Sequence, residues 1–121
     1  MIIDKINIAE KLSLITDHWN PRIAGELNGQ YIKLVKFKGE FVWHKHDNED
    51  EMFLVIAGSF TMELRDKSIS LNPGDYIIIP RGVEHKPVAN EEAHVLLFEP
   101  ATTLNTGNVE NELTKHTLDI I

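Results

Sequence analysis

Four side chains in this sequence have the types and the spacing of a metal site. His44 and His46 are two positions apart, and Glu51 and His85 follow further along the chain. Alternate residues of a β-strand leave the same face, so on a strand the two histidines would point the same way. Neutral imidazoles and a carboxylate suit a divalent first-row metal ion. The pattern predicts where the chemistry lies, but it does not define the reaction.

Other polar residues nearby have simpler explanations. Glu49 and Asp50 stand beside Glu51, but each is expected to be a solvated loop charge. Lys45 has the opposite parity to the two histidines and is expected to point away from the site. Three further histidines lie outside the pattern and are expected to be packed or exposed side chains, not ligands: His18, His94 and His116.

Composition narrows the class of protein. The chain has 121 residues, enough for one domain, with 12 basic and 19 acidic residues and a net charge of −7. Nucleic acid is not an expected partner, because phosphate binding needs a basic patch. The absence of cysteine excludes disulfides and thiolate ligands and fits a cytoplasmic protein. No apolar run is long enough to span a membrane, and the charged N-terminus does not resemble a signal peptide.

The remaining pattern is mostly that of short β-strands. Strands are predicted over residues 22–27, 31–38, 40–46, 51–57, 59–64, 68–71, 75–79 and 93–98. Turn residues separate them, including Asn28-Gly29, which is a strong hairpin signal, and Ala89-Asn90-Glu91. Many short strands at this spacing predict an all-β sandwich or barrel.

The two ends of the chain have a different pattern. Asn7 followed by Glu10 resembles a capping box and predicts a short helix over residues 8–13, although alternating apolar residues also fit an extended arm. We expect an N-terminal arm over residues 1–20 and a barrel over residues 21–100. A tail over residues 101–121 would pack as a second arm or fray.

A change of parity occurs at Gly39. Apolar residues before this glycine occupy odd-numbered positions, whereas His44 and His46 occupy even-numbered ones. A bulge or bend at Gly39 would exchange the two faces and turn the histidines inward. Phe41 and Trp43 would then form an apolar pair that points outward.

The strand at residues 51–57 has two apolar faces. Phe53 and Val55 share the face of Glu51 and are expected to line the site. The opposite face would carry three outward apolar side chains, Met52, Leu54 and Ile56. Because a monomer seldom exposes so much apolar surface, we expect the N-terminal arm or a second subunit to cover it, and a two-fold homodimer is the commonest such assembly.

Together these residues resemble the two sequence motifs of the cupin superfamily. The first reads Gly39, four residues, His44-Lys45-His46, four residues, Glu51, six residues, Gly58; the second reads Gly74, five residues, Pro80-Arg81-Gly82, two residues, His85. Two positions depart from the usual pattern: one residue fewer separates Gly39 from His44, and Ala89 replaces an asparagine. Neither departure changes the set of ligands. The chain also resembles a group of small single-domain cupins, whose members often carry a mannose-6-phosphate isomerase-like label.

The resemblance implies a small antiparallel jelly-roll β-barrel that holds a metal inside, bound by His44, His46, Glu51 and His85. Cupin metals include manganese, iron, zinc, nickel and copper. On a six-coordinate ion, four protein ligands would leave two positions for water, a substrate or dioxygen. On zinc the same ligands would approach a closed tetrahedron, which is typical of a structural site.

Three functions remain compatible with the sequence. The first is a metal-dependent enzyme that acts on a small polar molecule by isomerisation, oxygenation or lyase chemistry. The second is a non-catalytic module that binds a small molecule or sugar, and the third is a barrel without a ligand that serves as a scaffold. Sugar-phosphate isomerisation needs a phosphate clamp, and Arg81 and Lys86 are the only cations near the motifs. No nucleophile with an adjacent base is visible.

Overall fold

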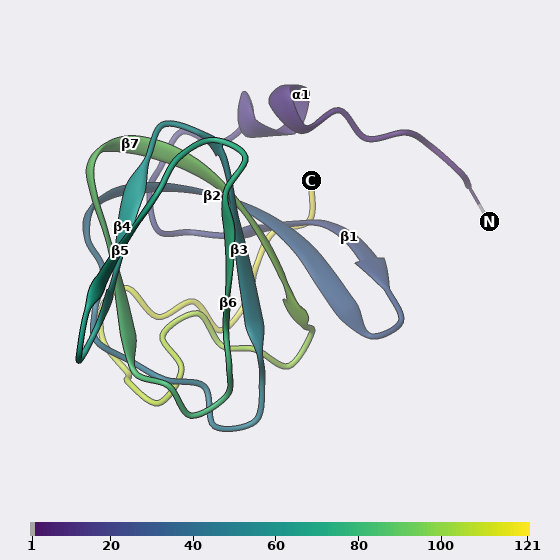
Figure 1. Cartoon of the computed structure of the whole chain (residues 1–121). Coiled ribbons are helices and arrows are strands. Elements are labelled where there is room, and N and C mark those ends of the chain that lie inside the picture. Colours follow the sequence, from purple (N-terminus) through teal and green to yellow (C-terminus); the bar gives the residue numbers. More distant parts are fainter. Residues whose placement is uncertain (1) are drawn as a thin grey trace.

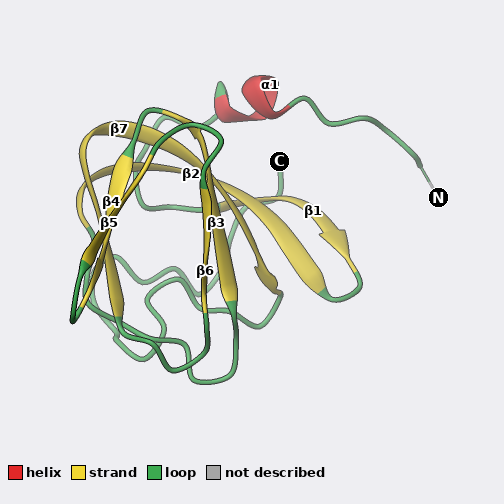
Figure 2. Cartoon of the chain, viewed as in Figure 1, coloured by secondary structure: helices red, strands yellow, loops and turns green. Residues whose placement is uncertain are grey.

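The computed structural model describes residues 2–121, which form an antiparallel β-barrel with one short helix outside it (Figure 1, Figure 2). The predicted all-β fold is therefore confirmed. The elements in chain order are α1 (Ile8–Leu12), β1 (Arg22–Leu27), β2 (Gln30–Glu40), β3 (Glu51–Ala57), β4 (Phe60–Leu64), β5 (Ser68–Leu71), β6 (Tyr76–Ile79) and β7 (His85–Pro100).

Strand β7 is the centre of the sheet. Its second half lies between β2 and β3, and its first half pairs with β4, which in turn pairs with β5. Strand β6 continues the sheet beyond β3. Because β7 belongs to both parts of the sheet, its bend brings β4 and β5 opposite β3 and β6, as Figure 1 shows. The chain thus encloses an interior.

The predicted turn at residues 89–91 is wrong, because β7 runs on through it. Phe37 of β2 pairs with Ala93, and Gly39 pairs with Ala89, so residues 90–92 form a bulge opposite a single residue of β2. The polar residues that indicated a turn are the exposed part of this bulge. The register shift falls at Gly39 as predicted, and this glycine has a φ of 82°.

The predicted strand at residues 40–46 is also wrong beyond Glu40. Beyond Glu40 the chain makes one backbone hydrogen bond to β7, from the Phe41 N–H to the Pro87 carbonyl at 3.0 Å, and then pairs with it in an isolated bridge between His44 and His85. Phe41 does not point outward as expected but is 9% exposed, with its ring 4.9 Å from that of Trp19. The inward face changes from odd-numbered to even-numbered residues only after Phe41, where the backbone is irregular. Phe41 and the two motif histidines therefore all point inward. Trp43 lies outside, with its ring 3.9 Å from the Arg65 guanidinium.

The two local predictions at the start of the chain are confirmed. The Asn7 side chain accepts a hydrogen bond from the Glu10 backbone at 2.9 Å and caps helix α1. Asn28 and Gly29 have φ angles of 50° and 77°, the left-handed pair that a tight hairpin between β1 and β2 requires.

The segment before β1 covers part of the outer face. Leu12 and Ile15 form a second apolar cluster with Leu34, and Ile56 and Leu96 pack against it. The N-terminal arm therefore covers Ile56, one of the three outward residues of β3. Cover by this arm was one of the two predicted alternatives, the other being a second subunit. No helix in the described part of the chain is long and apolar enough to cross a membrane.

The residues after Pro100 pack against the barrel. Thr103 and Thr106 are buried, and the Asn108 backbone N–H donates to the Lys45 carbonyl at 3.1 Å while the Asn108 side chain accepts from the Lys45 N–H at 2.9 Å. A side chain at Gly107 would meet the Lys45 carbonyl oxygen at 2.1 Å, so only glycine permits this approach. The tail thereby holds the segment that carries the two motif histidines.

Candidate metal centre

The structure brings the four predicted residues to one place inside the barrel. His44 and His46 lie in the loop between β2 and β3, while Glu51 begins β3 and His85 begins β7. One potential ligand atom from each residue lies within 4.8 Å of the other three, and all four side chains are buried. Backbone hydrogen bonds of 2.9 and 3.1 Å join His44 directly to His85. Chain segments 41 positions apart in sequence are thus fixed side by side.

Two of the imidazoles are oriented by backbone carbonyls. His44 Nδ1 donates to the Val42 carbonyl at 2.8 Å, and His85 Nδ1 donates to the Val83 carbonyl at 2.9 Å. A carbonyl only accepts, so Nδ1 carries a proton in both rings, and in the neutral form of each ring Nε2 is the nitrogen with the free lone pair. This arrangement is typical of metal-binding histidines, in which the second nitrogen donates to a fixed partner.

Three polar atoms at the centre of the cluster have no hydrogen-bond partner among residues 2–121. They are His46 Nε2, His85 Nε2 and Glu51 Oε1, and the carboxylate oxygen lies 3.2 and 3.5 Å from the two nitrogens. Buried polar groups without partners are costly and rare in folded proteins. A divalent cation at their common centre would interact with all three atoms, and the cluster suits such an ion.

The electrostatic environment favours the protonation states in which side chains bind a metal ion. Burial and the neighbouring His85 lower the pKa of His44 to about 4, so His44 is a neutral imidazole near pH 7. Burial alone would raise the pKa of Glu51, but the neighbouring His46, His85 and Glu99 side chains hold it well below its usual range. At neutral pH, His44 is therefore already a neutral imidazole and Glu51 already a carboxylate. Neither has to release a proton when a metal ion binds.

A second carboxyl group behind Glu51 was not predicted. Glu99 of β7 lies beside Glu51, and its Oε1 is 2.8 Å from Lys33 Nζ of β2. Burial and the Glu51 charge raise the pKa of Glu99 well above its usual range, although Lys33 opposes them. Lys33 lies two positions from the buried Val35, and Glu99 lies two positions from the buried Leu97. Because alternate residues of a strand share a face, this spacing alone indicates that both side chains point inward.

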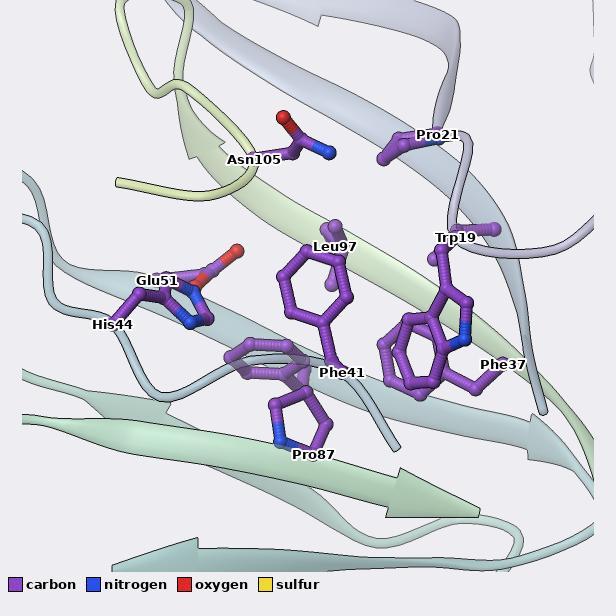
Figure 3. Close-up of a pocket in the computed structure, with 11 residues that line it drawn as sticks. Trp19, Pro21, Phe37, Phe41, His44, Glu51, Pro87, Leu97 and Asn105 are labelled. Carbon is purple, nitrogen blue, oxygen red and sulfur yellow. The ribbon is translucent and has the colours of Figure 1, made fainter. Parts of the chain in front are cut away.

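The cluster opens onto an apolar pocket. His44 and Glu51 lie at one end, and Trp19 stacks on Phe37 at the other, with ring centroids 4.5 Å apart (Figure 3). Phe53 lines this pocket as expected, whereas Val55 is buried in the core and does not reach it. Asn105 of the tail also lines the pocket, although no pattern in the sequence predicted this position.

The charged residues next to the motif histidines contact other side chains and backbone groups, outside the cluster. The Lys45 ammonium lies 3.5 Å from Asp47, Glu49 accepts from Thr102 at 2.9 Å, and Asp50 accepts from the Arg81 N–H at 2.9 Å. The three other histidines are paired with glutamates outside the cluster, His18 and His94 with Glu92 and His116 with Glu110.

Comparison with known proteins identifies the family to which this chain belongs. The cupin domain model matches residues 33–99, more than half of the chain. Over 62 residues, half of this chain, the sequence is 36% identical to the uncharacterized protein YdbB of Bacillus subtilis, and the match spans only 55% of that protein.

Two crystal structures are similar over most of the chain. A cupin-2 domain containing protein from Shewanella frigidimarina is 47% identical, with a TM-score of 0.78 over 78% of this chain and 93% of that one. Protein NMB1881 from Neisseria meningitidis is 26% identical, with a TM-score of 0.75 over 81% of this chain and all of that one. With the matched family model and the shared architecture, the chain belongs to the cupin domain family.

Proposed function

We propose that this protein holds a divalent metal ion at His44, His46, Glu51 and His85 and uses it to bind and transform a small molecule in the adjoining pocket. The observation that carries the proposal is the convergence of three buried atoms without hydrogen-bond partners, His46 Nε2, His85 Nε2 and Glu51 Oε1. When bound, the ion would act as a Lewis acid toward an oxygen atom of the small molecule.

The protein's own residues prepare this site. The Val42 and Val83 carbonyls hold two imidazoles with Nε2 facing the centre. The carboxylate of Glu51 lies at the edge of the pocket, where it would offset part of the charge of a bound ion. The aromatic side chains beyond it exclude water, which strengthens electrostatic interactions at the site.

The metal content of untagged protein tests this proposal. We expect about one divalent ion per chain by elemental analysis, and we expect His46→Ala to lose it because one of four ligands is removed. The matched control is His116→Ala, since His116 is exposed and pairs only with Glu110. Equal metal content in the two variants, or none in the parent protein, would contradict the proposal.

A non-catalytic binding module is the second candidate. One observation favours it: among residues 2–121, only Glu51 and His44 bring an acidic or basic side chain to the pocket, and the metal would occupy both. Proton transfer by a separate side chain is therefore not provided. Turnover in a panel of diketones, sugar phosphates and catechols, with and without oxygen, would favour the enzyme, whereas a ligand-dependent thermal shift without turnover would favour the module.

We further propose that the chain forms a homodimer through the outer face of β3 and β6. Tyr76 and Ile78 are 63% and 55% exposed there and pair with the half-buried Leu54 and Met52. Light scattering coupled to gel filtration tests this proposal. We expect Ile78→Asp to give monomers and Ile2→Asp, at an exposed residue of the N-terminal segment, to leave the dimer intact. A monomeric parent protein would exclude it.

A further inference from the structure

The candidate metal site is closed on its aromatic side. The pocket that His44 and Glu51 line has an enclosed volume of about 30 Å³. This space holds about two waters, since each needs roughly 10–15 Å³. Beyond it, Trp19 stacks on both Phe37 and Phe41, with ring centroids 4.5 and 4.9 Å apart. A divalent ion that still carries several waters does not fit through this packed side of the barrel.

A second hollow reaches the cluster from the outside. It has a volume of about 190 Å³ and lies between the loop of residues 45–49 and four residues of the tail, Thr102, Leu104, Gly107 and Asn108. The tail lies along this loop (Figure 1), where the Asn108 N–H donates to the Lys45 carbonyl at 3.1 Å. We call this space the outer hollow. It has room for an ion together with its first shell of waters.

His46 forms the wall between the outer hollow and the cluster. Its side chain is 2% exposed and lines the outer hollow, while its Nε2 lies 3.2 Å from Glu51 Oε1 inside the cluster. Its Nδ1 lies on the side of the tail, 3.2 Å from the position that a Cβ on Gly107 would take. An ion that passes from the outer hollow to the cluster must therefore pass this ring.

His46 is also the imidazole whose ring is least fixed. Backbone carbonyls hold Nδ1 of His44 at 2.8 Å and Nδ1 of His85 at 2.9 Å. Within residues 2–121 no such carbonyl holds Nδ1 of His46, although the backbone of this residue accepts from the Gly82 N–H at 2.8 Å. Rotation of the His46 ring thus breaks no bond of this kind, whereas rotation of either other ring breaks one.

The outer hollow has an acidic wall. The carboxylates of Asp47 and Glu49 line it together with the Asn48 side chain. The Lys45 ammonium lies 3.5 Å from Asp47 and offsets one of the two carboxylates, so negative charge remains. Oxygen atoms are the groups that hydrated divalent ions contact in proteins. A cleft lined by negative charge also raises the local concentration of such ions.

We propose that divalent ions reach the candidate site through the outer hollow, where Asp47 and Glu49 collect the hydrated ion and the His46 ring turns to admit it. The collection of ions follows from the outer hollow alone, whereas their passage to the cluster rests on the proposed metal site. His46 is then the last of the four ligands to close around the ion, and it separates the bound ion from solvent.

The rate of metal loading tests the collection step. Metal-free protein is mixed with Co²⁺ in a stopped-flow instrument, and visible absorption reports binding. Asp47→Asn/Glu49→Gln should load about three- to tenfold more slowly than the parent protein at low salt. The difference should shrink at high salt, which screens exposed charges.

The control for this step removes the same charge elsewhere. Glu10→Gln/Glu26→Gln changes two exposed carboxylates on α1 and β1, outside the outer hollow. This double variant should load like the parent protein. Equal loading rates in the two double variants at low salt would overturn the proposal.

Loosening of the tail tests the passage at His46. The Asn108 side chain accepts from the Lys45 N–H at 2.9 Å, and Asn108→Ala removes this bond. Loading of Co²⁺ and its release to excess chelator should both become faster, with little change in Kd. Asn20→Ala, which removes a bond to Asp17 away from the outer hollow, should change neither rate. An unchanged loading rate in Asn108→Ala, whatever its release rate, would overturn the passage at His46.

A further titration distinguishes failure of this inference from failure of the proposed metal site. Mn²⁺ is added to the parent protein with one equivalent of Zn²⁺, which nitrogen and oxygen ligands bind more tightly than Mn²⁺. Paramagnetic broadening of the NMR amide signals of Asp47, Asn48 and Asn108 is expected, and Asp47→Asn/Glu49→Gln should lose it. If the protein takes up no Zn²⁺, the proposed function and the passage at His46 both fall, and the same titration still tests collection. Absence of broadening in the parent protein would exclude collection itself.

Discussion

Lys33 and Glu99 form an ion pair inside the barrel, with Nζ and Oε1 2.8 Å apart and each side chain 1% exposed. Lys33 Nζ also lies 3.4 Å from the Thr103 carbonyl of the tail, so the pair joins β2, β7 and the tail. Glu99 in turn lies beside Glu51. Lys33, Glu99 and Glu51 thus form a buried series, and the last of them faces the candidate metal site.

Removal of Lys33 should destabilise the protein strongly. Lys33→Met leaves buried carboxyl groups without their cation, and the loss of one partner of a buried pair costs about 3–5 kcal/mol of the free energy of unfolding. Urea unfolding of the metal-free protein measures this value. Lys86→Met is the matched control, because Lys86 pairs with Glu40 on the surface and such pairs contribute about 0–1 kcal/mol. Equal effects of the two substitutions would contradict the role assigned to Lys33.

The stability of the metal-free protein should fall as the pH falls from about 6.5 to 4. His44 has a folded pKa of about 4 and a model value of 6.5, so in this range the unfolded chain binds the proton first. His44 makes its full contribution to the free energy of unfolding above about pH 6.5. This contribution, up to about 3 kcal/mol, is lost as the pH falls toward 4.

Urea unfolding between pH 4 and 7 measures this dependence. His44→Gln should flatten the curve, because its side chain does not titrate. His116→Gln, at an exposed histidine, should leave the curve as in the parent protein. An unchanged slope in His44→Gln would show that other groups are responsible.

The close approach of the tail at Gly107 should be essential to the metal-site loop. In Gly107→Ala the new methyl group meets the Lys45 carbonyl oxygen at 2.1 Å, and such overpacking costs about 1–3 kcal/mol. Gly74→Ala is the control, because Gly74 also has a positive φ, 91°, but nothing lies within 4 Å of the added atom. Chemical unfolding and metal titration should show larger losses for Gly107→Ala. Similar losses in both variants would mean that backbone strain alone accounts for them.

Removal of the metal should lower the melting temperature. A ligand present at 100 times its Kd and bound only to the native state adds about 2.7 kcal/mol, which for a domain of this size is roughly 10 °C. Differential scanning calorimetry before and after chelation tests this expectation. The His46→Ala variant should show no shift on chelation, and an equal shift there would place the stabilising ion elsewhere.

Local patterns in the sequence predicted much of the fold. The turn at Asn28-Gly29, the cap at Asn7 and the register shift at Gly39 depend on residues that have few alternatives at those backbone conformations. The four clustered residues were predicted through the motif, and their approach to one another follows from the pairing of His44 with His85.

The errors have a physical cause in tertiary contacts. Residues 90–92 have turn composition, yet pairing with β2 and β4 carries β7 through them as a bulge. Phe41 points inward because the irregular segment after it, and not Gly39, changes the face. Asn105 reaches the pocket through hydrogen bonds within the tail, and no local pattern encodes that path.

The proposed site requires that three imidazoles and one carboxylate bind a single ion. Anomalous diffraction from crystals of untagged protein, recorded at the absorption edge of the metal found by elemental analysis, locates that ion. We expect one strong peak per chain between His44, His46, Glu51 and His85. A stoichiometric metal whose peak lies elsewhere, or a map without a peak among these four side chains, would contradict it.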